Sequence, residues 1–231
     1  MRNMHYEVRD ALAFANAVPQ PVGRVGIIGA TAPGVGIAMN LLAADVPVTL
    51  FELDRDSLDK GVALARSGCE DAVAKGMLAA TKRDRRMALL AGTVNFHHLK
   101  DCDLIIEAVC TDTLGTQKLF HRLDQVAKPG AILMTHASHA CIDHVADCTK
   151  RPGDVLGLHF PSPGIVSGMW ELMCGKQTSA QAVATVITLA RMLHEVASVS
   201  DGYHSSALDL RSAAQLRDQR SVTWQIDQAL E

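Results

Sequence analysis

Short apolar runs alternate with longer amphipathic segments along most of the chain. The runs at 24–28 and 103–109 are apolar at nearly every position, as in strands of a parallel sheet that is covered on both faces. Residues 54–75, in contrast, carry apolar side chains such as Leu58 and Val62 at helical spacing. Because strand-like and helix-like segments follow one another, the pattern predicts an α/β fold with a Rossmann-like, doubly wound and mostly parallel sheet.

The same pattern assigns the individual elements and the parts of the chain. The expected strands are 24–28, 47–52, 93–96, 103–109, 131–135, 155–160 and 169–173. The expected helices are 34–44, 54–75, 81–90, 113–127, 142–148 and 178–196, the last of them capped by Thr178. We expect three parts in all: a lead-in or linker over 1–22, the main domain over 23–200 and a short helical C-terminal tail over 201–231.

Composition narrows the class of protein. The 231 residues, of which 48% are hydrophobic, are enough for one large domain with a sizeable core. A formal net charge of −3 offers no attraction to a polyanion, so no nucleic-acid partner is expected. No apolar run approaches the roughly 20 residues needed to span a bilayer, and the six cysteines are scattered without a disulfide framework. These features predict a cytoplasmic protein with reduced thiols and no membrane partner.

A glycine-rich turn follows the first expected strand. It reads G-A-T-A-P-G over residues 29–34, and the next strand ends in the acid Glu52. Strand, glycine turn, helix and strand-end acid form the layout of a dinucleotide-binding βαβ unit. Gly29 would make the tight turn, and Gly34 would allow the helix to pack closely on the strand. Glu52 would accept hydrogen bonds from the adenosine ribose, which favours NAD over NADP.

Two residues of this turn depart from the dinucleotide-binding pattern. Thr31 replaces the middle glycine, whose lack of a side chain lets the backbone approach the pyrophosphate, and it would be strained if the turn required a positive φ there. Pro33 suits the first turn of a helix but has no N–H to offer a phosphate. Together these changes would weaken cofactor binding on the order of a hundredfold or more. The alternative is a relaxed loop that binds NAD only somewhat more weakly.

Further segments follow the pattern of a known family in the same order along the chain. They are R-V-G-I-I-G-A at 24–30, G-I-A-M-N at 36–40, P-V-T-L-F-E at 47–52, L-I-I-E-A-V at 104–109, V-A-K-P-G-A-I-L at 126–133 and G-L-H-F-P-S-P at 157–163. On these segments, residues 22–200 resemble the NAD-binding domain of the L-3-hydroxyacyl-CoA dehydrogenases. The lead-in resembles the end of the linker in the multifunctional fatty-acid oxidation enzymes. The resemblance implies oxidation of the 3-hydroxyl of an acyl-CoA to a ketone, with hydride passed to NAD.

The resemblance also implies which residues carry the chemistry. Hydride leaves the substrate carbon only if the hydroxyl proton leaves as well, and histidine is a suitable base at neutral pH. The family's base lies in an H-F-x-x-P motif, here His159, and its partner carboxylate is here Glu171, which would fix the imidazole tautomer. Ser138 matches a serine that hydrogen-bonds the substrate oxygen. Glu107 matches a residue near the nicotinamide ribose.

Other positions depart from the family. Thr116 takes the place of a lysine, and His136 and Ala137 replace the asparagine and threonine of an N-T-S motif that supports the nicotinamide site. After Val199 the chain no longer matches the family's helical domain, which supplies dimer contacts and much of the acyl-CoA cleft. The resemblance therefore implies an acyl-CoA substrate together with a homo-oligomer or a partner chain that supplies the helical half.

A crowded group of histidines and cysteines suggests a different chemistry. Histidine and cysteine are zinc ligands, but here they lie on an expected strand end, a loop and a helix without a known ligand spacing, so no metal site is expected. The group is His136, His139, Cys141, His144 and Cys148.

Two classes of function stay open from the sequence. One is an NAD-dependent 3-hydroxyacyl-CoA dehydrogenase, with a dehydrogenase for another substrate as its variant. The other is a non-catalytic relative that keeps the scaffold as a binding domain. The first predicts stabilisation of the fold by NAD, and the second predicts none.

Overall fold

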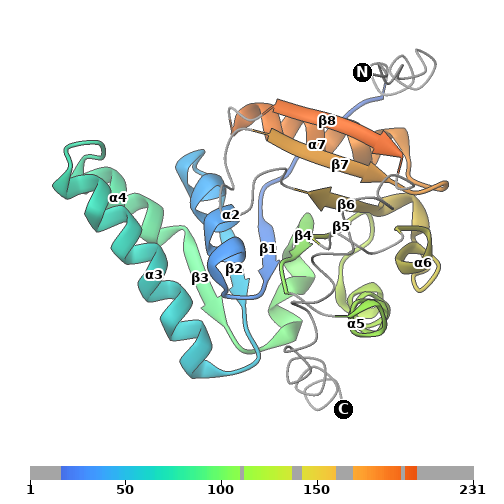
Figure 1. Cartoon of the computed structure of the whole chain (residues 1–231), viewed down its shortest axis with the longest axis horizontal. Coiled ribbons are helices and arrows are strands. Elements are labelled where there is room, and N and C mark those ends of the chain that lie inside the picture. Colours follow the sequence, from blue (N-terminus) through green and yellow to red (C-terminus); the bar gives the residue numbers. More distant parts are fainter. Residues whose placement is uncertain (1–16, 110–111, 137–141, 160–168, 194–195, 202–231) are drawn as a thin grey trace, which may run out of the picture.

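The computed structural model describes residues 17–109, 112–136, 142–159, 169–193 and 196–201. Its strands form one eight-stranded sheet in the order β3-β2-β1-β4-β5-β6-β7-β8 (Figure 1). Neighbouring strands are parallel, except for β6 and β7, which run antiparallel. The strands are β1 Val25–Ile28, β2 Val48–Phe51, β3 Leu90–Thr93, β4 Leu104–Glu107, β5 Ile132–Thr135, β6 Val155–His159, β7 Met169–Cys174 and β8 Val196–Asp201. The predicted Rossmann-like, doubly wound fold is confirmed.

Helices cover both faces of the sheet. On one face, sheet residues such as Ile27 pack with Ile37 of α2 and Val183 of α7, and on the other Ile105 packs with Phe120 of α5. Because successive side chains of a strand point to opposite faces, two covered faces explain why the central strands are apolar at nearly every position. The helices are α2 Ala32–Ala43, α3 Arg55–Ala74, α4 Ala80–Ala88, α5 Thr113–Val126, α6 Ile142–Ala146 and α7 Ala180–Met192, with 3₁₀ turns η1 Phe96–Asp101 and η2 Pro152–Asp154.

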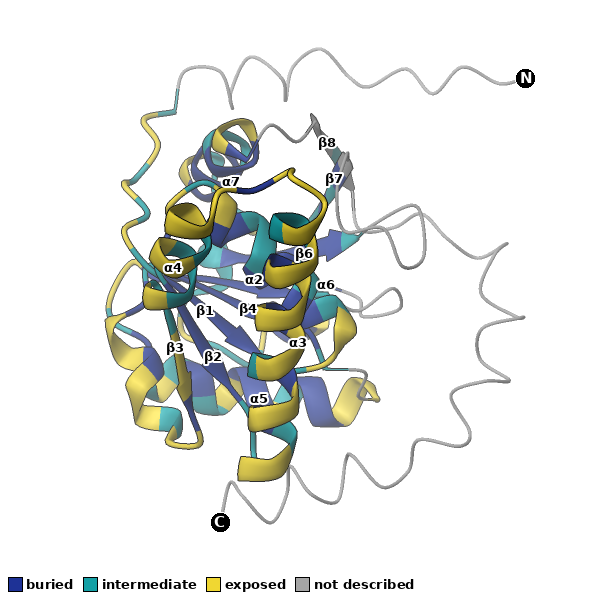
Figure 2. Cartoon of the chain, turned by 90° about the vertical axis from the view of Figure 1, so that its left-hand side faces the viewer, coloured by how far each residue is buried: buried dark blue, intermediate teal, exposed yellow. Residues whose placement is uncertain are grey.

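The α3 helix packs against the turn after β1. Asp54 caps its start by accepting a hydrogen bond from the backbone N–H of Ser57 at 2.8 Å, and this bond lowers the pKa of the Asp54 carboxyl. Gly61 lies on the buried side of α3, where a Cβ would come within 2.5 Å of the Cβ of Ala30. The opposite side of α3 is exposed (Figure 2). Close packing at Gly61 therefore supports the glycine turn from outside the sheet.

The structure corrects the prediction around β3. The expected helix 81–90 ends at Ala88, and the expected strand 93–96 is instead Leu90–Thr93, followed by η1. Strand β3 pairs with β2 from Leu90 onward, and it lies at the edge of the sheet with Ala91 and Gly92 exposed. A half-exposed edge strand lacks the continuous apolar run of a central strand, so the pairing with β2 rather than local periodicity decides its position.

The end of the domain also differs from the expectation. The cap of α7 is Ser179, whose hydroxyl accepts from the N–H of Ala182 at 3.1 Å, while Thr178 donates to the carbonyl of Val155 at 2.9 Å. The helix ends at Met192, and the residues expected to continue it toward 196 lead into the edge strand β8, which the periodicity analysis missed. The alternation of apolar Ala197 and Val199 with polar Ser198 and Ser200 is the sequence signal that could have indicated it.

The ends of the chain are described only in part. Residues 17–22 lie along α7, where the N–H of Gln20 donates to Thr185 Oγ1 at 2.9 Å and Gln181 Nε2 donates to the carbonyl of Val18 at 3.2 Å. The rest of the lead-in and the tail over 202–231 lie outside the described residues. The division into lead-in, domain and tail stays a prediction.

Two properties of the described residues concern membrane spans and cysteine chemistry. Among their helices, none is long and apolar enough to cross a membrane. Cys69, Cys102 and Cys148 are free thiols, and burial raises the pKa of the Cys102 thiol to about 11. A thiol protonated at neutral pH is a poor nucleophile, so Cys102 serves the core.

Candidate active site

The site lies where the strand order of the sheet reverses. Strand β1 has β2 on one side and β4 on the other, all parallel, so the connections after β1 and β4 leave the same edge in different directions. In open α/β sheets, this point at the carboxyl ends of the strands forms a crevice that binds ligands. The turn after β1, which spans residues 29–34, forms one side of it.

Both outer glycines of this turn are required by the backbone. Gly29 has φ of +106°, and a Cβ there would also lie 2.9 Å from Cγ2 of Val109, in the segment after β4. At Gly34 a Cβ would overlap the carbonyl oxygen of Gly29. Gly29 therefore makes the turn, and Gly34 lets α2 approach it, which are the roles that the sequence predicts for them.

Thr31 is not strained, because the turn does not require a positive φ at this position. It has φ of −78° and ψ of 170°, which any residue adopts, and it lies directly before α2. Its hydroxyl donates to the carbonyl of Ala108 at 3.3 Å, across the point where the strand order reverses. The middle position thus needs no glycine for folding. The Thr31 side chain lies between the turn after β1 and the segment after β4.

Pro33 occupies the second position of α2. The first amides of a helix have no acceptor within the helix, so they are the groups that face a bound anion. Pro33 removes one of them, which leaves the N–H groups of Ala32 and Gly34 in the same turn. The N–H of Val35 does not face the crevice as a further donor, because it donates to the carbonyl of Thr31 at 2.8 Å. The turn therefore offers a phosphate fewer N–H donors than a turn without proline would.

Glu52 lies at the end of β2 beside the turn. Its Oε2 accepts from the N–H of Ala30 at 2.9 Å, and its Oε1 accepts from the N–H of Leu53 at 2.8 Å. A carboxylate offers about four lone-pair positions, so two remain for the two hydroxyls of a ribose. The arrangement orients the carboxylate and keeps it half-buried at the crevice.

Glu107 is fully buried at the end of β4. Its Oε2 accepts from the hydroxyl of Thr135 at 2.6 Å, and its Oε1 accepts from the N–H of Val109 at 2.9 Å. Burial raises the pKa of the Glu107 carboxyl to about 7, while these two hydrogen bonds act in the opposite direction. Glu107 thus joins the ends of β4 and β5 and changes charge near neutral pH.

His136 directly follows β5. Its backbone N–H donates to the carbonyl of Glu107 at 2.7 Å. Burial first, and then the positive charge of His159, lower the pKa of the His136 imidazole. His136 is therefore neutral at neutral pH, and His159 lies near enough to interact with it.

The two residues expected to handle the proton form a cross-strand pair. His159 ends β6, and Glu171 lies opposite it in the antiparallel register of β6 and β7. Side chains of directly opposed residues share a face, with Cβ atoms roughly 5 Å apart. The prediction that twelve residues suffice for the chain to return beside His159 agrees with this register. Both residues lie at the end of the sheet formed by the carboxyl ends of β4, β5 and β6, where Glu107 and His136 also lie.

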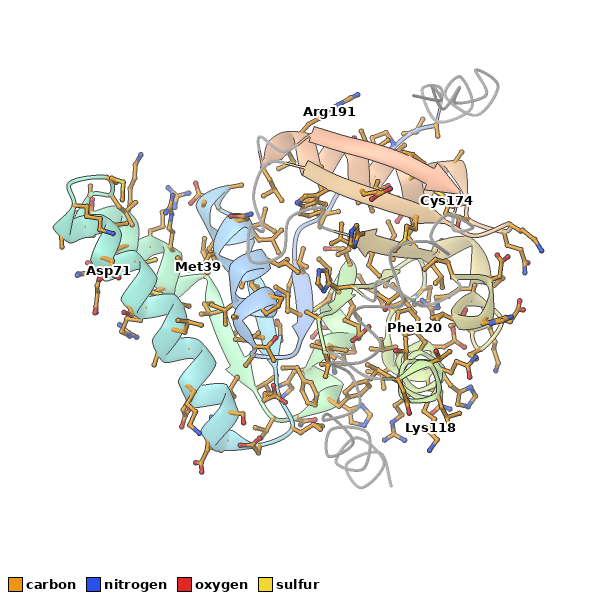
Figure 3. All side chains as sticks on the ribbon, in the orientation of Figure 1. Met39, Asp71, Lys118, Phe120, Cys174 and Arg191 are labelled. Carbon is orange, nitrogen blue, oxygen red and sulfur yellow. The ribbon has the colours of Figure 1, made fainter. Side chains whose placement is uncertain are left out.

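Several other candidate positions lie outside the described residues or on α5. Ser138 lies outside the described residues, as do His139 and Cys141 of the crowded group. Thr116, at the position of the family lysine, is buried in α5. Lys118 is exposed on the side of α5 away from the sheet (Figure 3), so it is no substitute for that lysine.

The crevice and its glycine turn define a dinucleotide-binding domain of the Rossmann class. Within that class, residues 24–201 match the family model described as 3-hydroxyacyl-CoA dehydrogenase, NAD binding domain. The chain therefore belongs to this family, whose cofactor is NAD. The structure fits that cofactor in its required glycines, Gly29 and Gly34, and in the oriented carboxylate of Glu52.

Relatives of known type agree with this assignment. The peroxisomal bifunctional enzyme of Danio rerio is 31% identical over 224 residues, which cover 94% of this chain and 30% of that protein. The 3-hydroxybutyryl-CoA dehydrogenase of Clostridioides difficile is 31% identical over 173 residues, with 75% of this chain and 62% of that protein covered. A multifunctional fatty-acid β-oxidation protein of Oryza sativa is 32% identical, but only 24% of it is covered. The chain thus spans a quarter to a third of its multifunctional relatives.

Solved structures show the same fold. The crystal structure of M. tuberculosis FadB2 has a TM-score of 0.74 and 34% identity, covering 86% of this chain and 73% of that one. The 3-hydroxybutyryl-CoA dehydrogenase of Escherichia coli has a TM-score of 0.76 and 27% identity, covering 79% of this chain and 39% of that one.

Proposed function

We propose that this chain binds NAD in the crevice between β1 and β4 and takes part in the oxidation of an L-3-hydroxyacyl-CoA to a 3-ketoacyl-CoA. The observation that supports the proposal is the antiparallel register of β6 and β7, in which Glu171 lies directly opposite His159. A base held beside a carboxylate, next to a dinucleotide crevice, matches what alcohol oxidation requires.

Each residue has a role in this proposal. NAD, when bound, supplies the hydride acceptor. His159 takes the proton of the substrate hydroxyl, and Glu171 holds the imidazole in one tautomer and stabilises its protonated form. Glu52 accepts from the adenosine ribose, and Glu107 lies by the nicotinamide ribose. Ser138 would hydrogen-bond the substrate oxygen.

The acyl-CoA part of the site would need more than this chain. The family's helical domain supplies much of the acyl-CoA cleft, and a partner chain would provide it here. The location is part of the same proposal. The free thiols fit a reducing compartment such as the cytoplasm, although several plant and animal relatives are named as peroxisomal or glyoxysomal proteins.

A second candidate function is a binding domain that keeps the scaffold without catalysis. The observation that favours it is the turn after β1, where Thr31 bonds to Ala108 across the crevice and Pro33 lacks an amide hydrogen. Both changes would weaken the contacts of the turn with a pyrophosphate, and both are compatible with the fold.

Titration of the full chain with NADH, followed by calorimetry, separates the two candidates. A dissociation constant in the micromolar range would support the dehydrogenase proposal. The variant Glu52→Ala should then bind about tenfold more weakly, because the ribose hydroxyls lose a charged acceptor. An absence of binding at millimolar NADH would overturn the proposal for this chain and leave the binding domain.

Turnover tests the role of His159. If the chain reduces acetoacetyl-CoA with NADH, His159→Ala should lower kcat by about a thousandfold or more and leave the NADH dissociation constant almost unchanged. The exposed His144 offers a matched control, since His144→Ala should keep full activity. Activity retained by His159→Ala would show that another group is the base.

A further inference from the structure

A groove lies between α5 and the segment that follows α6, two elements that pack side by side (Figure 1). One wall is formed by residues of α5 between 117 and 125, and the other by residues 147–150. Its volume of about 790 Å³ falls within the range of ligand pockets. Residues 147–150 precede β6, whereas the cofactor crevice lies at the carboxyl ends of the parallel strands. The groove is therefore separate from that crevice.

Hydrogen bonds connect the two walls of the groove. Nδ1 of His121 donates to the carbonyl of Cys148 at 3.3 Å, and Nε2 of Gln125 donates to Nε2 of His121 at 3.2 Å. Because a carbonyl oxygen can only accept, these partners require the neutral imidazole with its hydrogen on Nδ1. The groove is thus formed without a ligand, and His121 adds no charge to it.

The acid between the walls is neutralised within the fold. Oδ1 of Asp124 accepts from Nε of Arg151 at 2.9 Å, and Oδ2 accepts from the backbone N–H of Lys150 at 3.1 Å. The Asp124 side chain is only 8% exposed. The second acid of the groove, Asp147, accepts a long hydrogen bond from Nε2 of Gln177 at 3.4 Å. Asp147 therefore keeps its charge, whereas Asp124 adds little to the field in the groove.

Positive groups come from both walls. Arg122 and Lys118 lie one turn apart on α5, and the exposed Lys150 lies on the opposite wall. Nε of Arg122 is buried and has no acceptor among the residues that the structure describes. Buried donors in folded proteins almost always have a partner. A guanidinium pairs two of its N–H groups with the oxygens of a phosphate or a carboxylate. An unpaired arginine donor beside a groove therefore points to an anionic ligand.

We propose that this groove binds a sugar phosphate, with Arg122 and Lys150 holding the phosphate from opposite walls. The groove is much larger than one phosphate group, so the ligand has a further part. The remaining lining is rich in groups that hydrogen-bond hydroxyls, namely Gln117, Gln125 and Asp147. This lining favours a body with several hydroxyls over an apolar chain. The site does not depend on the proposed function, because it uses none of the residues of the crevice.

The experiment titrates the full chain with ribose 5-phosphate and, in parallel, with ribose, and follows both by calorimetry. Ribose 5-phosphate should bind with a submillimolar dissociation constant, and ribose should not bind measurably. Arg122→Gln should weaken binding about tenfold or more, because it removes a charge and the paired donors. Lys150→Gln, at an exposed position, should weaken it about threefold. Arg66→Gln, which removes an exposed arginine of α3, is the matched control and should leave binding unchanged.

Two further measurements separate this site from the crevice and from a loss of folding. Arg122→Gln should leave the dissociation constant of NADH and the unfolding temperature almost unchanged, while Arg122→Lys should bind ribose 5-phosphate more weakly than the wild type because it lacks the paired donors. No binding of ribose 5-phosphate at about 10 mM would overturn the inference. Equal binding by the wild type, Arg122→Gln and Lys150→Gln would also overturn it, because the phosphate would then lie elsewhere, as in the turn after β1. Either result leaves the proposed function standing, since that depends on the titration with NADH.

Discussion

The turn after β1 and the strand pair β6–β7 belong to the same site but relate differently to their family. The strand pair keeps the histidine and the carboxylate in register. The turn keeps its outer glycines and has changed between them, at Thr31 and Pro33. The difference shows that the turn can change its ligand-facing groups while the histidine and carboxylate that we propose for proton transfer stay in register, because separate parts of the sheet position the two sets.

The turn itself contains two kinds of glycine position. Gly29 and Gly34 satisfy the backbone, by a positive φ in one case and by close packing in the other. The middle position has an extended backbone that accepts threonine. Threonine is therefore compatible with the fold at this position, and we expect the replacement of glycine to affect binding rather than folding.

Among the substitutions that test the two regions, Gly34→Ala should have the largest effect on stability. Its Cβ would overlap the carbonyl oxygen of Gly29, so α2 must move away from β1. We expect a loss of about 3 kcal/mol or more in the free energy of unfolding, measured by urea denaturation. A loss below about 1 kcal/mol would contradict the claim that this glycine is required for packing.

Glu107 ends β4, which lies between the turn after β1 and the strand pair β6–β7 in the order of the sheet. The variant Glu107→Gln tests how burial of this carboxyl affects stability. The folded-state pKa of Glu107, raised by burial to about 7 from an ordinary value of 4.5, means that the folded chain binds the proton more tightly than the unfolded chain. The stabilising contribution of Glu107 is therefore present below about pH 4.5 and is lost as the pH rises through about 7. Over that window the wild type should lose roughly 3 kcal/mol relative to the variant. Thermal or urea denaturation at several pH values measures this difference, and parallel pH profiles would contradict it.

Thr31→Gly should increase the affinity for NADH by about tenfold, because it removes a β-branched side chain from the path of the pyrophosphate. Stability should fall by at most about 1 kcal/mol, through the greater freedom of glycine in the unfolded chain. Thr31→Ser separates two causes, since it keeps the hydroxyl that bonds to Ala108 and loses the methyl group. Calorimetry that shows equal affinity in all three chains would mean that Thr31 does not limit binding.

Gly68→Ala should have the smallest effect and serves as the control for Gly34. Gly68 lies on the exposed side of α3, and the nearest atom to a Cβ there would be Cε of Met39 at 3.7 Å, an ordinary contact. Alanine should raise the stability of the chain by about 0.5 to 1 kcal/mol through its better helix propensity. Destabilisation in the same urea assay would show that α3 packs differently from the structure.

The sequence predicted much of the fold because local patterns carried it. The helix expected over 54–75 is Arg55–Ala74, and the central strands lie within two residues of their expected bounds. Element types failed only near the sheet edges, at β3 and β8. There one side of the strand pairs with no other strand of the described residues, so its side chains need not follow the apolar pattern of the interior.

The amino-acid sequence by itself determined the order of strands and helices from β1 to α7, the glycines of the turn and, through its family motif, the identity of the histidine and carboxylate that form a pair. Tertiary structure alone decided that Thr31 adopts an extended backbone and bonds to Ala108, that Glu107 loses contact with water, and that His136 lies near His159. The reason is physical. Helix and strand periodicity depend on neighbours a few positions away, whereas burial, charge and hydrogen bonding at the sheet edge depend on segments that meet only after the chain has folded.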